Sequence, residues 1–152
     1  MEITIKLNCL LEAIKHGYAN PNKEQVGMIL GDKSHWYLSQ FIPMRNISTS
    51  SVVHYEPHPD DLYSVLSQTT HFHKDAKLDL VGTFHTHPHS EPTPSIIDIL
   101  GTSYDSEKEL DPKDVGYEAI YIIFSPSLAK ISFQYYDGLK FGFKPVNVNI
   151  IN

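Results

Sequence analysis

Two histidines separated by one residue, His85 and His87, are the most plausible metal ligands in this chain of 152 residues. They end the segment Leu78–His87, whose apolar pattern predicts a β-strand. Successive side chains of a strand point to opposite faces, so residues two apart project from the same face. The spacing therefore predicts that both imidazoles point the same way and can chelate one divalent metal ion.

A proline-rich loop then leads to a short predicted helix that offers a third ligand. Thr93 is a favoured N-cap residue, and Pro94 suits the first helical position. Ser95 and Asp98 are three residues apart and fall on the same side of this helix. If the loop folds back, Asp98 completes a set of two histidines and one aspartate. Such a set leaves the fourth tetrahedral position for water, as catalytic zinc sites require.

Hydrolysis at such a site also needs a general base and a donor for the developing oxyanion. Ser95 is placed for the second role. Spacing says little about the base, because it can come from anywhere in the fold. Glu24 is the candidate, since it shortly precedes a predicted strand, Val26–Leu30, of the same sheet.

These residues resemble the signature of the JAMM/MPN zinc metalloprotease family. The stretch HTHPHSEPTPSIID, residues 85–98, matches the pattern H-[S/T]-H-P-x5-P-S-x2-D at each fixed position. Upstream, EQVGMILG at residues 24–31 is similar to the family's glutamate followed by Gly-apolar-apolar-apolar-Gly. Gln25 stands where many relatives carry a small residue or cysteine.

The resemblance spans nearly the whole chain and implies a compact catalytic core with a cytidine-deaminase-like α/β fold, a mixed central sheet packed between helices. It implies one Zn2+ per chain held by His85, His87 and Asp98, with Glu24 as general base and Ser95 as donor to the oxyanion. The implied activity is that of an isopeptidase or peptidase. It would hydrolyse the amide bond after the C-terminus of ubiquitin or a ubiquitin-like modifier, so the expected partner is such a protein or its conjugates.

Other functions remain open on the same core. A hydrolase that trims the C-terminus of a sulfur-carrier protein needs the same catalytic residues. Some MPN-fold proteins have lost the metal and act as dimerisation scaffolds, but this chain retains all the ligands. Homodimerisation through the helices is compatible with catalysis. A zinc deaminase is excluded, because it needs P-C-x-x-C and Cys9 is the only cysteine.

The remaining histidines make weaker candidates. The run HYEPH at residues 54–58 superficially suggests a metalloprotease helix, but Pro57 and Pro59 prevent helical chelation there. His71 and His73 are expected to be solvated near a helix end. His89 lies inside the site loop and could contact the substrate.

The elements that must position these residues are expected in the order β-α-β-β-β-α-β-α-β-β-β. In the first helix the apolar stripe is expected at Leu7, Leu10, Leu11 and Ile14. In the strand of the histidines, Val81 is expected on their face and Leu80 on the other. The expected helices are Leu7–Ala19, Pro59–Phe72 and Pro94 to near Gly101, and the expected strands are Glu2–Ile5, Val26–Leu30, Trp36–Ile42, Ile47–Tyr55, Leu78–His87, Ala119–Ser125, Ala129–Tyr136 and Leu139–Val148.

The composition predicts one soluble domain over residues 1–152. Eighteen acidic residues against 12 Lys and Arg give a net charge of −6 and argue against nucleic acid as a partner. No apolar run is long enough to span a membrane and no signal peptide opens the chain, so a cytoplasmic protein is expected. Cys9 is expected to be a buried apolar residue. The polar, acidic segment 102–116 is expected to be a loop.

Overall fold

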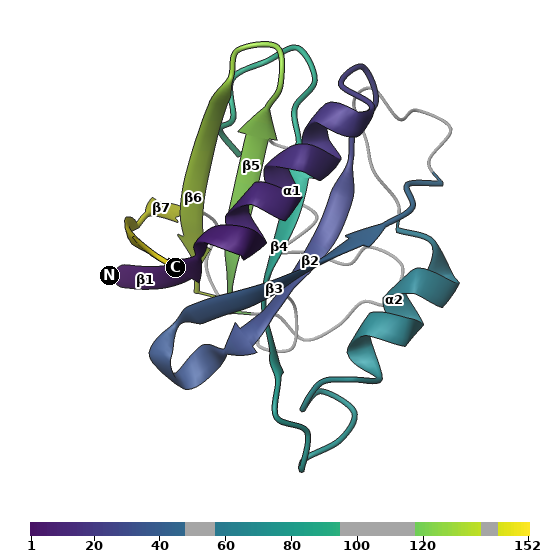
Figure 1. Cartoon of the computed structure of the whole chain (residues 1–152), viewed down its shortest axis with the longest axis vertical. Coiled ribbons are helices and arrows are strands. Elements are labelled where there is room, and N and C mark those ends of the chain that lie inside the picture. The colour runs from purple at the N-terminus through teal and green to yellow at the C-terminus, as the bar shows by residue number, and fades with distance from the viewer. Residues whose placement is uncertain (48–56, 95–117, 138–142) are drawn as a thin grey trace.

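The computed structural model describes residues 1–47, 57–94, 118–137 and 143–152 (Figure 1). Its centre is a mixed eight-stranded sheet with the order β7-β6-β5-β4-β2-β3-β1-β8. Within the described residues, the strands are β1 (Glu2–Lys6), β2 (Val26–Asp32), β3 (Tyr37–Met44), β4 (Asp79–Thr86), β5 (Ala119–Ser125), β6 (Lys130–Tyr136), β7 (Lys144–Pro145) and β8 (Asn147–Ile151). The helices there are α1 (Leu7–Ala19), α2 (Pro59–Leu66) and the 3-10 turn η1 (Lys33–His35).

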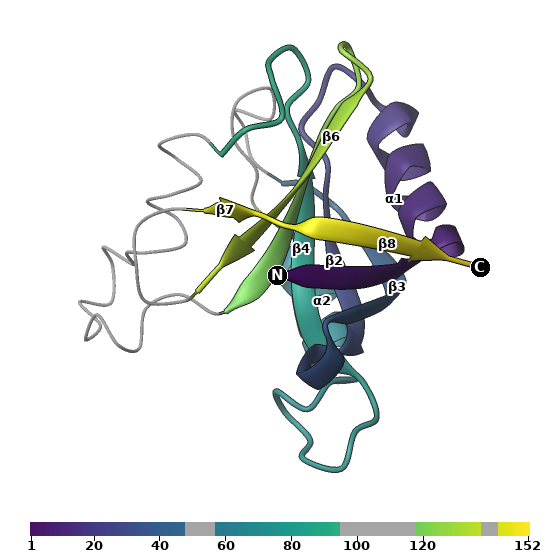
Figure 2. The same ribbon diagram turned by 90° about the vertical axis from the view of Figure 1, so that its left-hand side faces the viewer.

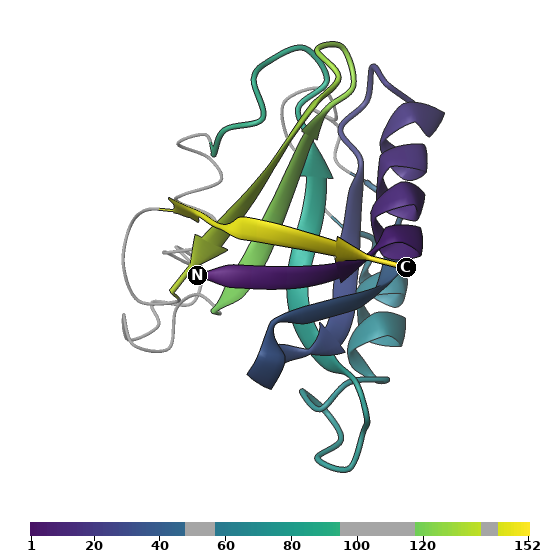
Figure 3. The ribbon, with the colours of Figure 1, turned by 60° about the vertical axis from the view of Figure 1, so that its left-hand side comes forward.

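Helix α1 covers one face of the sheet, as Figures 2 and 3 show from two sides. Its buried residues are Cys9, Leu10, Ala13 and Gly17, spaced three or four apart as on one face of a helix. Leu11, expected in this stripe, is instead 51% exposed. The buried stripe thus runs through Cys9 and Ala13, small residues that let the helix lie close to the strands.

Helix α2 packs on the opposite face. Its Val65 joins a cluster with Val26, Met28 and Leu30, which are alternate residues of β2. Ile29, between them, belongs to the core beneath α1. The period-2 alternation of β2 therefore divides its side chains between the two helices.

The central pair, β2 and β4, runs antiparallel with an irregularity between Ile29 and Leu30. Because of this shift, Leu80 packs with the α2-side cluster and Val81 lies in the core beneath α1. The expectation that Val81 shares the face of His85 was therefore wrong. A β-bulge of this kind offsets the alternation by one residue, and an unbroken period of two cannot reveal it.

Several boundaries also differ from the sequence prediction. Helix α2 ends at Leu66 rather than at residue 72, and turns follow it. In place of the one expected last strand there are two: β7 pairs antiparallel with β6 at one edge of the sheet, whereas β8 pairs in parallel with β1 at the opposite edge. The expected strand Ile47–Tyr55 beyond its first residue, the helix expected after Pro94 and the acidic segment 102–116 lie outside the described residues.

Cys9 is buried on α1, as expected, at 2% exposure, and burial raises the pKa of its thiol to about 12. It is therefore a protonated, unreactive thiol at neutral pH. Among the helices of the described residues, none has the length and apolar character needed to cross a membrane.

Candidate metal centre

Three potential metal ligands meet where β2 begins and β4 ends. The two strands pair with Val26 opposite His85, so Glu24, two residues before Val26, comes to lie opposite His87. Ligand atoms of Glu24, His85 and His87 all lie within 4.8 Å of one another. Residues separated by about 60 positions in the chain are thus brought to one point by the antiparallel register.

The two imidazoles point the same way, as the strand alternation predicted. Nε2 of His85 and Nε2 of His87 are 3.2 Å apart. Two nitrogens bound to one tetrahedral zinc at about 2.0–2.1 Å would stand about 3.3 Å apart. The observed separation therefore fits a shared metal ion.

The orientation of the His87 ring is fixed by a hydrogen bond on the side away from Nε2. Its Nδ1–H donates to the backbone carbonyl of Glu91 at 2.8 Å, which places the lone pair of the neutral ring on Nε2. The loop that carries this carbonyl is tied to β6: Lys130 Nζ bonds the Glu91 carboxylate at 3.1 Å, and the Ser132 hydroxyl donates to the Pro92 carbonyl. Strand β6 therefore helps to set the tautomer of a ligand on β4.

Thr86, between the two histidines, has a role that the sequence analysis missed. Its hydroxyl accepts the backbone N–H of Gln25 at 2.8 Å, and its own N–H donates to the Gln25 carbonyl at 3.0 Å. These two bonds hold the segment next to Glu24 against the end of β4. The [S/T] position of the signature could have indicated this role. In this structure the hydroxyl at that position is needed to accept the Gln25 N–H.

Asn46 supports Glu24 from the other side and was also missed. Its side-chain Nδ2–H donates to the backbone carbonyl of Glu24 at 2.8 Å. Both residues are buried, Glu24 at 3% exposure. A carboxylate buried beside two imidazoles loses its hydration, and a divalent cation at this point would offset that cost.

The donor set thus fits zinc: imidazole nitrogen and carboxylate oxygen are both zinc ligands. Glu24, His85 and His87 are brought together as the sequence predicted. Ser95 and Asp98 lie outside the described residues, so their places in the site stay predictions.

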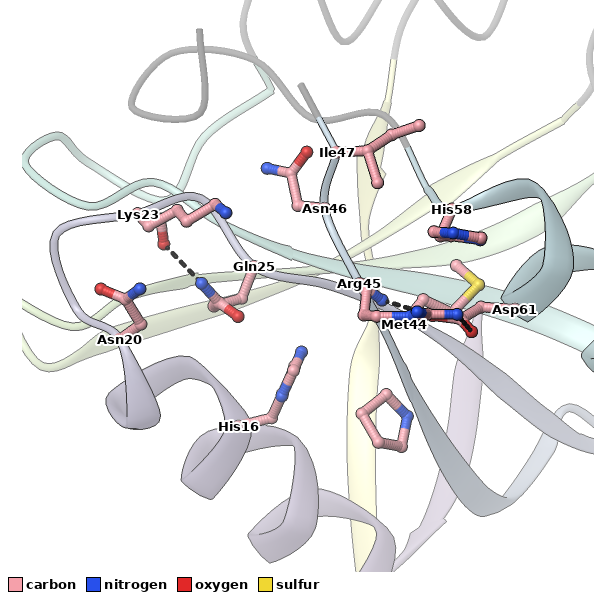
Figure 4. Close-up of a pocket in the computed structure, with 11 residues that line it drawn as sticks. His16, Asn20, Lys23, Gln25, Met44, Arg45, Asn46, Ile47, His58 and Asp61 are labelled. Atoms are coloured by element: carbon pink, nitrogen blue, oxygen red, sulfur yellow. Dashed lines mark hydrogen bonds and ion pairs between the residues drawn. The ribbon is translucent and has the colours of Figure 1, made fainter. Parts of the chain in front are cut away.

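A pocket of about 620 Å3 adjoins the segment that carries Glu24 (Figure 4). In Figure 4, His16 from α1 reaches up toward Gln25, and Arg45 lies beside Asp61. His16 Nε2–H donates to the Val26 carbonyl at 3.1 Å, and burial lowers the pKa of this ring. The pocket is lined by His16, Asn20, Lys23, Gln25, Pro43, Met44, Arg45, Asn46, Ile47, His58 and Asp61.

Four other described histidines, which the sequence offered as weaker candidates or places near the site, lie apart from this centre. His58 is the N-cap of α2, where its Nδ1 accepts the N–H of Asp60 at 3.1 Å. His71 and His73 are exposed in the turns after α2, and His89 is exposed in the loop after β4. None of these four belongs to the cluster of ligand atoms found among the described residues.

The sheet, helices α1 and α2 and the site define an α/β protein with the MPN fold. A JAB1/MPN domain protein from Archaeoglobus fulgidus superposes with a TM-score of 0.55 and 16% identity over 96% of this chain and 98% of that one. A protein of Desulfitobacterium hafniense superposes with a TM-score of 0.69 and 19% identity over 100% and 94%. At these identities the likeness concerns the fold.

Sequence comparison places the chain within this fold more narrowly. The profile of the prokaryotic homologs of the JAB domain, Prok-JAB, matches residues 7–135. A protein from Haloferax volcanii named desampylase is 30% identical over 118 residues, which are 77% of this chain and 73% of the relative. The chain belongs to the Prok-JAB family.

Proposed function

We propose that this protein is a zinc-dependent isopeptidase or peptidase that hydrolyses the amide bond after the C-terminus of a ubiquitin-like modifier. The observation that carries the proposal is the meeting of buried Glu24 with the paired Nε2 atoms of His85 and His87. A scaffold without catalysis has no need of two oriented imidazoles and a buried carboxylate at one point.

Each residue of the site would have a distinct role. His85 and His87 would hold the zinc through Nε2, with the Asp98 carboxylate as third ligand. When bound, zinc lowers the pKa of a coordinated water toward neutrality and polarises the scissile carbonyl. Glu24 would take the proton of the attacking water as the C–O bond forms. It would then pass this proton to the amine nitrogen as the C–N bond breaks, while Ser95 donates to the oxyanion.

The substrate class rests on family membership and on the relative that is named as an enzyme, a desampylase. A modifier whose flexible tail ends at the scissile bond can enter such a site in extended form. An extended tail can add to the edge of a sheet through its main chain, which gives affinity without demanding a particular sequence. The globular part of the modifier would then add contacts at a distance.

The variant Glu24→Gln tests the proposal. The glutamine side chain would keep the size of the residue but could not accept a proton, so hydrolysis should fall by roughly 10^2–10^4-fold. The assay follows, by mass spectrometry, a ubiquitin-like protein joined either to a lysine side chain or to a short C-terminal extension. The two substrates separate isopeptidase activity from C-terminal trimming.

Glu12→Gln is the matched control, since Glu12 is an exposed carboxylate on α1. It should cleave like the wild type. Elemental analysis should find about one zinc per chain in the wild type and in Glu24→Gln, and little in Asp98→Ala. Equal cleavage by the wild type and Glu24→Gln, or a wild type that binds no zinc when zinc is supplied, would overturn the proposal.

A further inference from the structure

Ser125, the last residue of β5, carries a buried hydroxyl for which the fold itself gives no use. The residue is 0% exposed. Its Oγ makes no hydrogen bond to any part of the chain that the structure describes. A buried hydroxyl without a partner costs free energy, and such groups are rare in folded proteins.

The register of the sheet puts this hydroxyl beside the metal centre. Strands β4 and β5 are parallel with Thr86 opposite Phe124, and His87 N–H donates to the Phe124 carbonyl at 2.9 Å. Ser125 is therefore the neighbour of His87 across the strands. Paired residues project from the same face, so Ser125 lies on the histidine side of the sheet, whereas Phe124 points into the core beneath α1.

A second hydroxyl on the same face is in the same condition. Thr83 lies two residues before His85, and its buried Oγ1 also has no hydrogen-bond partner among the described residues. By contrast, the hydroxyl of Ser39 on β3 donates to the Leu30 carbonyl at 3.3 Å. Two buried hydroxyls without a hydrogen-bond partner in the described chain thus lie beside the two histidines. Their position indicates that a polar group binds there.

We infer that Ser125 is a positioning residue of the metal centre, an inference that rests on the proposed function. When Nε2 of His85 binds the metal, the proton of the neutral imidazole must sit on Nδ1. Ser125 Oγ makes no direct bond to the described part of the chain, so its hydroxyl accepts this N–H through one buried water, to which Thr83 is the second contact. It thereby fixes the ring orientation of His85, as the Glu91 carbonyl fixes that of His87.

The test is the zinc affinity of Ser125→Ala, measured by competition with a chromophoric chelator in the absence of substrate. Loss of such an outer hydrogen bond typically weakens metal binding 10- to 100-fold, so the zinc Kd should rise by about 10-fold or more. The metal-free variant should unfold at the same temperature as metal-free wild type or at a higher one, because the substitution removes an orphan polar group. A residue with a purely structural role would show the opposite pattern.

Ser39→Ala is the matched control and should leave the zinc Kd unchanged. An unchanged Kd in Ser125→Ala, or a metal-free variant destabilised as much as the zinc-bound one, would overturn this inference and leave the proposed function standing. A wild type that binds no zinc would overturn both.

Discussion

At the scale of single residues, the centre depends on side chains that never touch the metal. Thr86 joins the end of β4, which carries the two histidines, to the segment before β2, which carries Glu24, through one bond made by its hydroxyl and one by its backbone N–H. It is 0% exposed. Asn46 and the Glu91 carbonyl act in the same way on Glu24 and His87. Each of these contacts fixes the orientation of a functional group whose position the site requires to be constant.

Thr86→Val tests how much the Thr86 hydroxyl contributes to stability and to hydrolysis. Valine keeps the shape of threonine but leaves the Gln25 N–H without its acceptor, which should cost about 1–3 kcal/mol of stability. Hydrolysis should also fall, because Gln25 adjoins Glu24. Urea unfolding and the cleavage assay measure the two effects.

Thr86→Ser keeps the hydroxyl and is the control. It should retain most of the activity despite losing a methyl group that lies close to α1 at Gly17. If the valine and serine variants were equally active, the hydroxyl would have no part in holding Glu24.

At the scale of elements, β4 is the strand on which the site depends, and it has little room to move. It lies between β2 and β5 in the sheet. Gly82 faces Ile120 of β5, and a Cβ at this position would overlap the Ile120 carbonyl. The glycine therefore permits the close approach of two strands whose ends carry His87 and Ser125.

Gly82→Ala should consequently destabilise the protein by about 1–3 kcal/mol, the usual cost of forcing atoms into a packed core. Thermal unfolding followed by circular dichroism measures it, and zinc content should fall because the strand ends shift.

Gly17→Ala on α1 is the comparison, because its Cβ would meet side-chain atoms rather than backbone, the nearest being the Thr86 methyl at 3.2 Å. A gain in helix propensity of about 1 kcal/mol would also offset that contact. A Gly82 variant as stable as the wild type would show that β4 and β5 can separate more easily than their register suggests.

At the scale of the whole molecule, the metal would join the end of β4 to the segment beyond the loop. The proposed ligands are His85 and His87 at the end of β4 and Asp98 after the loop, whereas Glu24, the proposed base, precedes β2. An ion that binds only the folded arrangement stabilises it by mass action. Metal binding at the site should therefore raise the free energy of unfolding of the whole protein.

Removing zinc with a chelator should lower the unfolding temperature. Zinc at 100 times its Kd contributes about 2.7 kcal/mol. At roughly 2–4 °C per kcal/mol for a chain of this size, the midpoint should fall by about 5–11 °C. Scanning calorimetry with and without EDTA measures the shift, and added zinc should reverse it. His87→Ala should show almost no shift, and a wild type that behaved likewise would contradict a bound metal.

The sequence by itself determined those features that depend on neighbouring residues. The two-residue spacing of the histidines placed both rings on one face because strand alternation is local. The bounds of α1 and β5 were likewise predicted correctly from their own apolar patterns. The match to the family signature singled out Glu24, which local patterning could only suggest.

Only the tertiary structure decided the features that depend on register between distant segments. Three such features join residues far apart in the chain. They are the bulge that moves Val81 to the α1 side, the pairing of β8 with β1, and the bond between Gln25 and Thr86. Nothing in the local pattern around Ser125 indicates that it lies beside His87. The register between strands determines such contacts, and this register depends on how side chains pack on both faces of the sheet. The contacts therefore exist only once the whole sheet has formed.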